Sequence, residues 1–84
     1  MTYYIPKSGR IGTIKTAGSI TEARRMAVSC IDRSKGQDAV IVYGPRMKSI
    51  GEVWSPNGVD ILWSPTGTDD YFPMRRDGTI KGRS

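Results

Sequence analysis

The sequence predicts an α+β fold in which a single helix packs on an antiparallel sheet of four to five strands, in the chain order β-β-α-β-β-β. Two observations support this prediction. One segment places apolar residues at helical spacing, and several short runs rich in β-branched and aromatic residues are separated by turns that contain Gly or Pro. With 84 residues the chain is expected to form one small domain, which leaves little room for a deep cavity.

The first predicted element is a hairpin. Residues 2–6 and 10–17 are rich in Tyr, Ile and Thr, which favour strands. Lys7, Ser8 and Gly9 lie between these segments and are typical of a turn. Gly12 is expected to weaken the second strand, because glycine offers no side chain for packing.

The next element is the predicted helix. Ser19 followed three residues later by Glu22 matches a capping box, in which each side chain accepts a hydrogen bond from the backbone of the other residue. Gly36 is a natural left-handed stop, so we expect about four turns. The apolar face that would pack on the sheet consists of Ile20, Ala23, Met26, Ala27, Cys30 and Ile31.

Three further strands are predicted after the helix. Residues 38–44 form a nearly continuous apolar run between turn residues, which indicates a central strand. Gly44-Pro45-Arg46 turns the chain, and residues 47–54 and 59–63 are expected to form the next two strands.

These last strands contain a repeated phrase, W-S-P-x-G-x-D, which starts at Trp54 and again at Trp63. Each copy suits a tight turn with Pro at its second position, so we interpret the repeat as two turns rather than one shared ligand site. A four-residue loop in the first copy would pair Trp54 with Val59. One face of the sheet would then carry Ile50, Trp54, Val59, Ile61 and Trp63.

A domain boundary is predicted near the end of the chain. Tyr71-Phe72 could form an edge strand, and Pro73 would end it. We therefore expect one compact domain over residues 1–73 and a basic, flexible tail over residues 74–84.

The composition argues against an enzyme. The chain contains no histidine, which removes the commonest general base and the commonest metal ligand. The single cysteine, Cys30, lies on the predicted apolar helix face and is expected to be a buried hydrophobe. Asp69 and Asp70 are adjacent on an extended chain and would point to opposite sides, so they do not make a metal site. No cofactor and no metal are expected.

The distribution of charge divides the chain into two parts. The net charge is +5, yet residues 49–73 contain four carboxylates and no Lys or Arg, so this segment is −4 and the remainder is +9. No membrane-spanning run and no signal peptide are recognised, so we expect a cytoplasmic protein with no membrane partner.

Two classes of macromolecular partner remain. The first is a protein, which could belong to a nucleoprotein complex and would be bound through the acidic, aromatic segment. Its candidate residues are Glu52, Trp54, Asp60, Trp63, Asp69 and Asp70. The alternative is nucleic acid, bound by basic groups on the helix, at a turn and in the tail. These candidates are Arg24, Arg25, Arg46, Lys48, Arg75, Arg76, Lys81 and Arg83.

In small size, absence of catalytic residues and mixed charge, the chain resembles the compact accessory proteins that bacteriophages and mobile elements encode. These include inhibitors of host nucleases such as anti-CRISPR proteins. The resemblance rests on general character and not on a motif, so it assigns no role to any residue. It implies a non-catalytic protein that inhibits a host nucleic-acid-handling complex.

Overall fold

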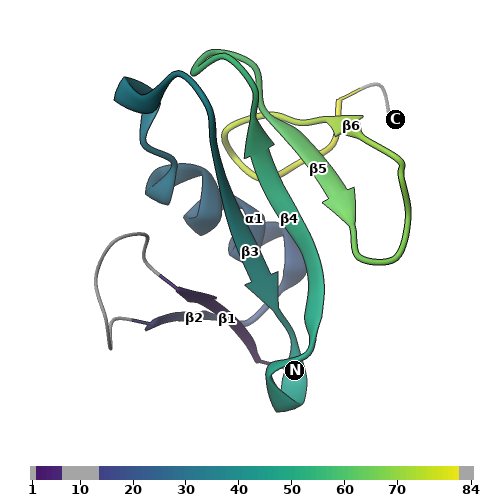
Figure 1. Cartoon of the computed structure of the whole chain (residues 1–84). Helices are drawn as coiled ribbons and strands as arrows, with labels where there is room; N and C mark the ends of the chain where they lie inside the picture. The colour runs from purple at the N-terminus through teal and green to yellow at the C-terminus, as the bar shows by residue number, and fades with distance from the viewer. Residues whose placement is uncertain (1, 7–13, 82–84) are drawn as a thin grey trace.

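The computed structural model describes residues 2–6 and 14–81 and has the predicted α+β architecture. Its sheet is antiparallel and has six strands in the order β2-β1-β3-β4-β5-β6 (Figure 1). The strand count exceeds the expected four to five, because a short sixth strand pairs with β5. The elements in chain order are β1 (Tyr3–Pro6), β2 (Ile14–Ala17), α1 (Ile20–Cys30), the 3₁₀ helix η1 (Arg33–Lys35), β3 (Asp38–Tyr43), the 3₁₀ helix η2 (Pro45–Met47), β4 (Ser49–Ser55), β5 (Leu62–Pro65) and β6 (Phe72–Pro73).

The two strands of the predicted N-terminal hairpin pair as expected. Tyr3 pairs with Ala17 and Pro6 pairs with Ile14. The expected turn at Lys7-Ser8-Gly9 and the glycine at position 12 lie outside the described residues. The pairing places β1 inside the sheet, between β2 and the central strand β3.

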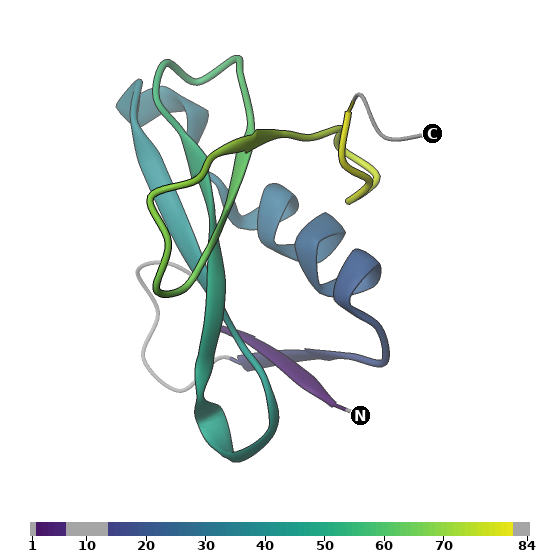
Figure 2. The ribbon, with the colours of Figure 1, turned by 90° about the vertical axis from the view of Figure 1, so that its right-hand side faces the viewer.

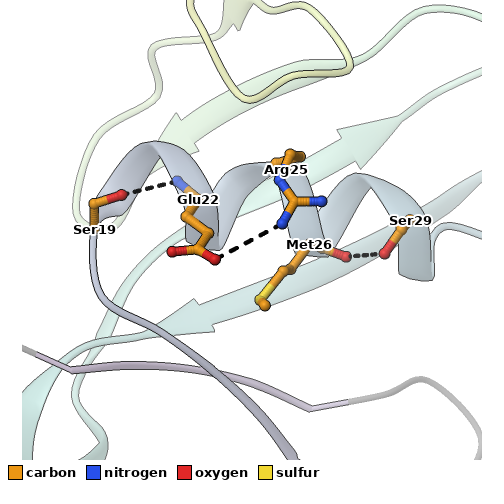
Figure 3. Close-up of polar contacts among 5 residues, drawn as sticks. All are labelled: Ser19, Glu22, Arg25, Met26 and Ser29. Atoms are coloured by element: carbon orange, nitrogen blue, oxygen red, sulfur yellow. Dashed lines mark hydrogen bonds and ion pairs between the residues drawn. The ribbon is translucent and has the colours of Figure 1, made fainter.

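Helix α1 begins as predicted and ends earlier than predicted. The Ser19 side chain accepts a hydrogen bond from the backbone N–H of Glu22 at 3.2 Å, which caps the first turn (Figure 3). The helix ends at Cys30, because Ile31 is extended and Asp32 caps the separate 3₁₀ turn η1. Gly36 is left-handed, as expected, but it closes η1 rather than α1. No helix of the described residues is long and apolar enough to cross a membrane.

The helix packs on one face of the sheet, and no α-helix of the described residues covers the other face (Figure 2). Ala23 and Ala27 are completely buried, since their small side chains let α1 approach the strands closely. The rest of the predicted apolar face, which is partly buried against the same core, consists of Ile20, Met26, Cys30 and Ile31. The core beneath it includes Ile5, Ala17, Val40, Val42, Val53, Trp63 and Met74.

The predicted register of the β4–β5 hairpin is wrong. Trp54 pairs with Leu62 rather than with Val59, and Val53 pairs with Trp63. Residues paired across strands share a face and neighbours in one strand alternate, so Trp54 and Trp63 lie on opposite faces of the sheet. The predicted common face of Ile50, Trp54, Val59, Ile61 and Trp63 therefore does not form.

The connection between β4 and β5 is longer than the predicted four-residue turn, and hydrogen bonds to two of its side chains stabilise it. The Asn57 side-chain oxygen accepts from the N–H groups of Val59 and Asp60, at 2.9 and 2.8 Å. The Ser55 hydroxyl accepts from the N–H of Gly58 at 3.1 Å. These bonds stabilise a loop that rejoins the sheet only at Leu62.

The second copy of the repeat forms a different turn. The N–H of Thr68 donates to the carbonyl of Pro65 at 3.3 Å, and Gly67 has a φ of 84°. This glycine is therefore the third residue of the turn, one position earlier than predicted, and its positive φ is typical of a type II turn. Both copies are turns, but they are not equivalent turns.

Residues 74–81 pack on the folded body, so the boundary predicted after residue 73 lies too early. Met74 is only 2% exposed and pairs with Ile80, which packs against the core. The N–H of Lys81 donates to the carbonyl of Pro73 at 2.8 Å. Gly78 lies against the backbone carbonyl of Thr21, which leaves no space for a β-carbon and joins this segment to α1.

Candidate functional site

The face of the sheet that α1 leaves uncovered carries a group of apolar and aromatic side chains. In β3, Val40 and Val42 are buried under the helix, so Ile41 between them projects to the opposite face and is 40% exposed. Ile41 pairs with Glu52, and Trp54 pairs with Leu62 on the same side. Tyr71 joins this group from the loop before β6. We call this surface the open face and define it by Ile41, Glu52, Trp54, Leu62 and Tyr71.

Trp54 and Tyr71 are in contact within the open face. Their ring centroids lie 5.4 Å apart and their planes are tilted by 53°, which is within the range of favourable aromatic pairs. Tyr71 nevertheless remains 50% exposed. Strand β4 therefore fixes the position of Trp54, and Tyr71 beside it presents aromatic surface to the solvent.

A shallow hollow of about 230 Å³ lies beside this pair. Ile41, Glu52 and Tyr71 line it, together with Ser64 of β5 and the start of the loop between β5 and β6. The hydroxyl groups of Ser49 and Thr66 are hydrogen-bonded at 2.7 Å, which joins that loop to β4 at the edge of the hollow. The open face is thus concave, and the hydrogen bond between Ser49 and Thr66 fixes one part of its edge.

The charge around this hollow is negative. Glu52 is one of its lining residues, and none of the lining residues is Lys or Arg. Asp69 and Asp70 are exposed and lie in the chain between Thr68 and Tyr71, both of which line the hollow. Four of the six residues predicted to bind a protein partner, Glu52, Trp54, Asp69 and Asp70, therefore belong to the open face or its border.

The other two residues of that predicted set lie elsewhere. Asp60 lines a different hollow with three basic side chains, and its carboxylate accepts a hydrogen bond from the Asn57 amide at 2.7 Å. Trp63 is only 6% exposed and lies in the core beneath α1. Asp60 and Trp63 were predicted to act with Trp54 because all three belong to the acidic, aromatic segment. The structure instead places Trp63 on the opposite face of the sheet and Asp60 at another hollow.

Arg24, a candidate for nucleic-acid binding, is engaged with this buried tryptophan. Its guanidinium lies 5.3 Å from the centre of the Trp63 ring, within the range of a cation–π interaction. Its Nε donates to the carbonyl of Gly78 at 2.8 Å. Burial lowers the pKa of Arg24 from its ordinary value. This arginine joins α1, β5 and the segment after β6.

The remaining basic candidates divide into three groups. Arg46 and Lys48 are exposed at the turn between β3 and β4. The second group, Arg75, Arg76 and Lys81, lines the same hollow as Asp60. Arg76 also lines a larger hollow with Arg25 and Arg33, on the side of the sheet that carries α1. Arg83 lies outside the described residues.

Two functional candidates, Ile41 and Tyr71, were missed by sequence reasoning. Ile41 could have been found from the alternation in β3, because its two neighbours are the buried residues of that strand. Tyr71 had no such signal, since its contact with Trp54 depends on the path of the loop between β5 and β6. Arg33 was expected on the helix as a further basic candidate, but it lies in η1, and the turn of the chain after α1 brings it to the same hollow as Arg25 and Arg76.

The described residues contain no cluster of three or more His, Cys, Asp or Glu side chains that could hold a metal ion. Cys30 is partly buried and packs against the core. Comparisons with protein-family models, with curated proteins and with solved structures find no match to this chain. Its function must therefore be argued from its own surfaces.

Proposed function

We propose that the chain is a non-catalytic binding protein whose open face docks on a basic, partly apolar surface of a protein partner. The observation that supports this proposal most directly is the contact of Trp54 with the half-exposed Tyr71, beside a hollow whose described lining residues include Glu52 and no Lys or Arg. The absence of histidine from the sequence further favours binding over catalysis.

The two kinds of group have separate roles in this proposal. Tyr71 and Ile41 supply the apolar contact area, because both are exposed while strands and loop hold their backbones in place. Aromatic side chains in such positions are frequent anchors of protein interfaces. Glu52, Asp69 and Asp70 attract a cationic surface, raise its association rate and disfavour acidic partners.

The chemistry of the open face is complementary to proteins that bind nucleic acid. Such proteins expose Lys and Arg for phosphates and flat apolar surfaces for bases. Carboxylates can occupy the positions of phosphates, and Trp54 with Tyr71 can occupy those of bases. We therefore propose that the chain inhibits a host nucleic-acid-handling complex, as a phage or mobile-element accessory protein of the anti-CRISPR kind would. A cytoplasmic location fits such a target and the single unpaired cysteine.

The experiment is capture of partners from host-cell lysate by the tagged chain, before and after nuclease treatment. We expect a basic protein to be retained after nuclease treatment and to be lost with the double variant Asp69→Lys/Asp70→Lys. Asp60 is left unchanged, because its hydrogen bond to Asn57 stabilises the β4–β5 loop. The control is Glu22→Lys/Asp32→Lys, which changes the net charge equally on α1 and at the Asp32 cap of η1, and circular dichroism checks that each variant keeps the fold of the wild type.

The purified partner then allows a quantitative test by isothermal titration. Replacing an interface anchor costs about 2 kcal/mol or more, so Tyr71→Ala should weaken binding by about thirtyfold or more. Equal affinity of the wild type and the Asp69→Lys/Asp70→Lys variant would overturn the proposal. So would loss of every captured protein on nuclease treatment.

A further inference from the structure

A second charged surface lies on the side of the sheet that carries α1. Three arginines from separate segments line one hollow of about 440 Å³: Arg25 from α1, Arg33 from η1 and Arg76 from the turn after β6. The first and last of them are far apart in the sequence. The packing of residues 74–81 beside the helix brings them to one place, because Gly78 lies against Thr21 and accepts a hydrogen bond from Arg24.

Two of these arginines have no carboxylate partner in the part of the chain that the structure describes. Arg25 lies 3.8 Å from the Glu22 carboxylate, and their side chains are about half exposed. Figure 3 shows this pair on the helix surface. Neither Arg33 nor Arg76 has an Asp or Glu oxygen within 4.0 Å among the described residues. Of the three arginines that line the hollow, only Arg25 has a carboxylate of the described residues beside it, so the hollow carries a net positive charge.

The other walls of the hollow are suited to a ligand that carries an apolar, hydrogen-bonding group in addition to an anionic one. Val28 and Ile31 supply apolar surface between the arginines. The Ser29 hydroxyl donates to the carbonyl of Met26 at 2.6 Å, so its oxygen remains able to accept a hydrogen bond (Figure 3). A volume of about 440 Å³ lies in the usual range of small-ligand sites.

We propose that this hollow binds the phosphates of a nucleic-acid strand, with Arg33 and Arg76 as the principal contacts and a nucleoside packed on Val28 and Ile31. The planar guanidinium donates two parallel hydrogen bonds to a phosphate, a geometry that a lysine cannot reproduce. The basic groups here are all arginines and converge from three segments, which favours fixed phosphate positions over diffuse attraction. This site does not depend on the partner of the open face.

The experiment is fluorescence anisotropy of the full chain with a labelled single-stranded oligonucleotide of about 12 nucleotides, within the site sizes usual for single strands. The test variant is Arg33→Gln/Arg76→Gln. We expect its affinity at low salt to fall about tenfold or more. The slope of log K against log salt should become shallower by about 1.4, since each lost phosphate contact removes about 0.7.

The matched control is Arg46→Gln/Lys48→Gln, which removes the same charge from the turn between β3 and β4. It should change the affinity and the slope by less than half as much. Equal effects of the two variants would overturn the proposal, because they would show a response to net charge alone. Absence of oligonucleotide binding by the wild type at low salt, or displacement by polyglutamate as effective as by unlabelled oligonucleotide, would also overturn it.

Discussion

The indole ring of Trp63 lies so close to Gly51 on the neighbouring strand that a β-carbon at residue 51 would be 2.5 Å from the ring. The guanidinium of Arg24 lies over the same ring at 5.3 Å. The absence of a side chain at residue 51 therefore lets the Trp63 ring enter the core. Trp54, one strand away and on the other face, remains available to the open face.

The first prediction concerns this contact. Gly51→Ala should lower the free energy of unfolding by about 1–3 kcal/mol, because the added methyl group must displace the Trp63 ring or the backbone behind it. Urea unfolding followed by tryptophan fluorescence measures the change. Gly18→Ala is the control, since no atom lies within 4 Å of a β-carbon there, and it should change stability by less than about 0.5 kcal/mol. Equal effects of the two substitutions would contradict the packing described.

The second prediction concerns the segment after β6. Met74→Ala should cost about 2–5 kcal/mol, because it removes a large side chain from the core and leaves a cavity. Arg76→Ala, on the exposed side of the same segment, should cost less than about 0.5 kcal/mol. Thermal and urea unfolding check both values. A Met74→Ala variant as stable as the wild type would show that residues 74–81 do not contribute to the core.

The third prediction concerns the turn between β3 and β4. Arg46 and Met47 both have a left-handed φ, at 62° and 57°, which costs an L-residue about 1–2 kcal/mol each. Met47 is 47% exposed, so Met47→Gly relieves strain without emptying the core and should raise stability by about 0.5–1 kcal/mol. Lys48 has an ordinary φ of −80°, so Lys48→Gly should lower stability instead. Chemical unfolding that gives the same sign for both variants would count against this turn geometry.

The fourth prediction concerns pH. The Thr79 hydroxyl and backbone N–H donate to Asp77 at 2.6 and 3.0 Å, and these bonds hold the pKa of that carboxyl below its ordinary value of 3.8. A folded-state pKa below the unfolded one stabilises the fold above the unfolded pKa, and the contribution is lost as the pH falls through the folded pKa. The carboxyl resonance of Asp77 should therefore titrate below pH 3.8 in an NMR series.

Thr79→Val separates the two bonds of this carboxylate. It removes the hydroxyl donor and keeps the backbone N–H, so the titration midpoint of Asp77 should rise toward its ordinary value without reaching it. Asp32 provides an internal reference, because Ser34 lowers its pKa in the same way and should continue to do so in the variant. An unchanged titration midpoint for Asp77 would show that the Thr79 hydroxyl is not what lowers the pKa of this carboxyl.

The elements that the sequence predicted correctly are those specified by neighbouring residues. Ser19 and Glu22 are three residues apart, and this local spacing was enough to place the start of α1. The period of the apolar residues identified the face with Ala23 and Ala27, and the apolar run at 38–44 identified the central strand β3. Each of these patterns depends on contacts that the residue types and their spacing already imply.

The features that the sequence left undetermined depend on contacts between distant segments. The length of the loop that Asn57 and Ser55 stabilise sets the pairing of Val53 with Trp63. In the predicted register, Trp54 and Trp63 would instead lie on the same face of the sheet. Likewise, only the packing of Gly78 on Thr21 shows that the basic C-terminal segment is folded and lies beside the helix. The sequence by itself determined which residues carry charge and aromatic surface. The tertiary structure decided which of them meet, because strand register and loop packing bring together side chains that have no fixed relation along the chain.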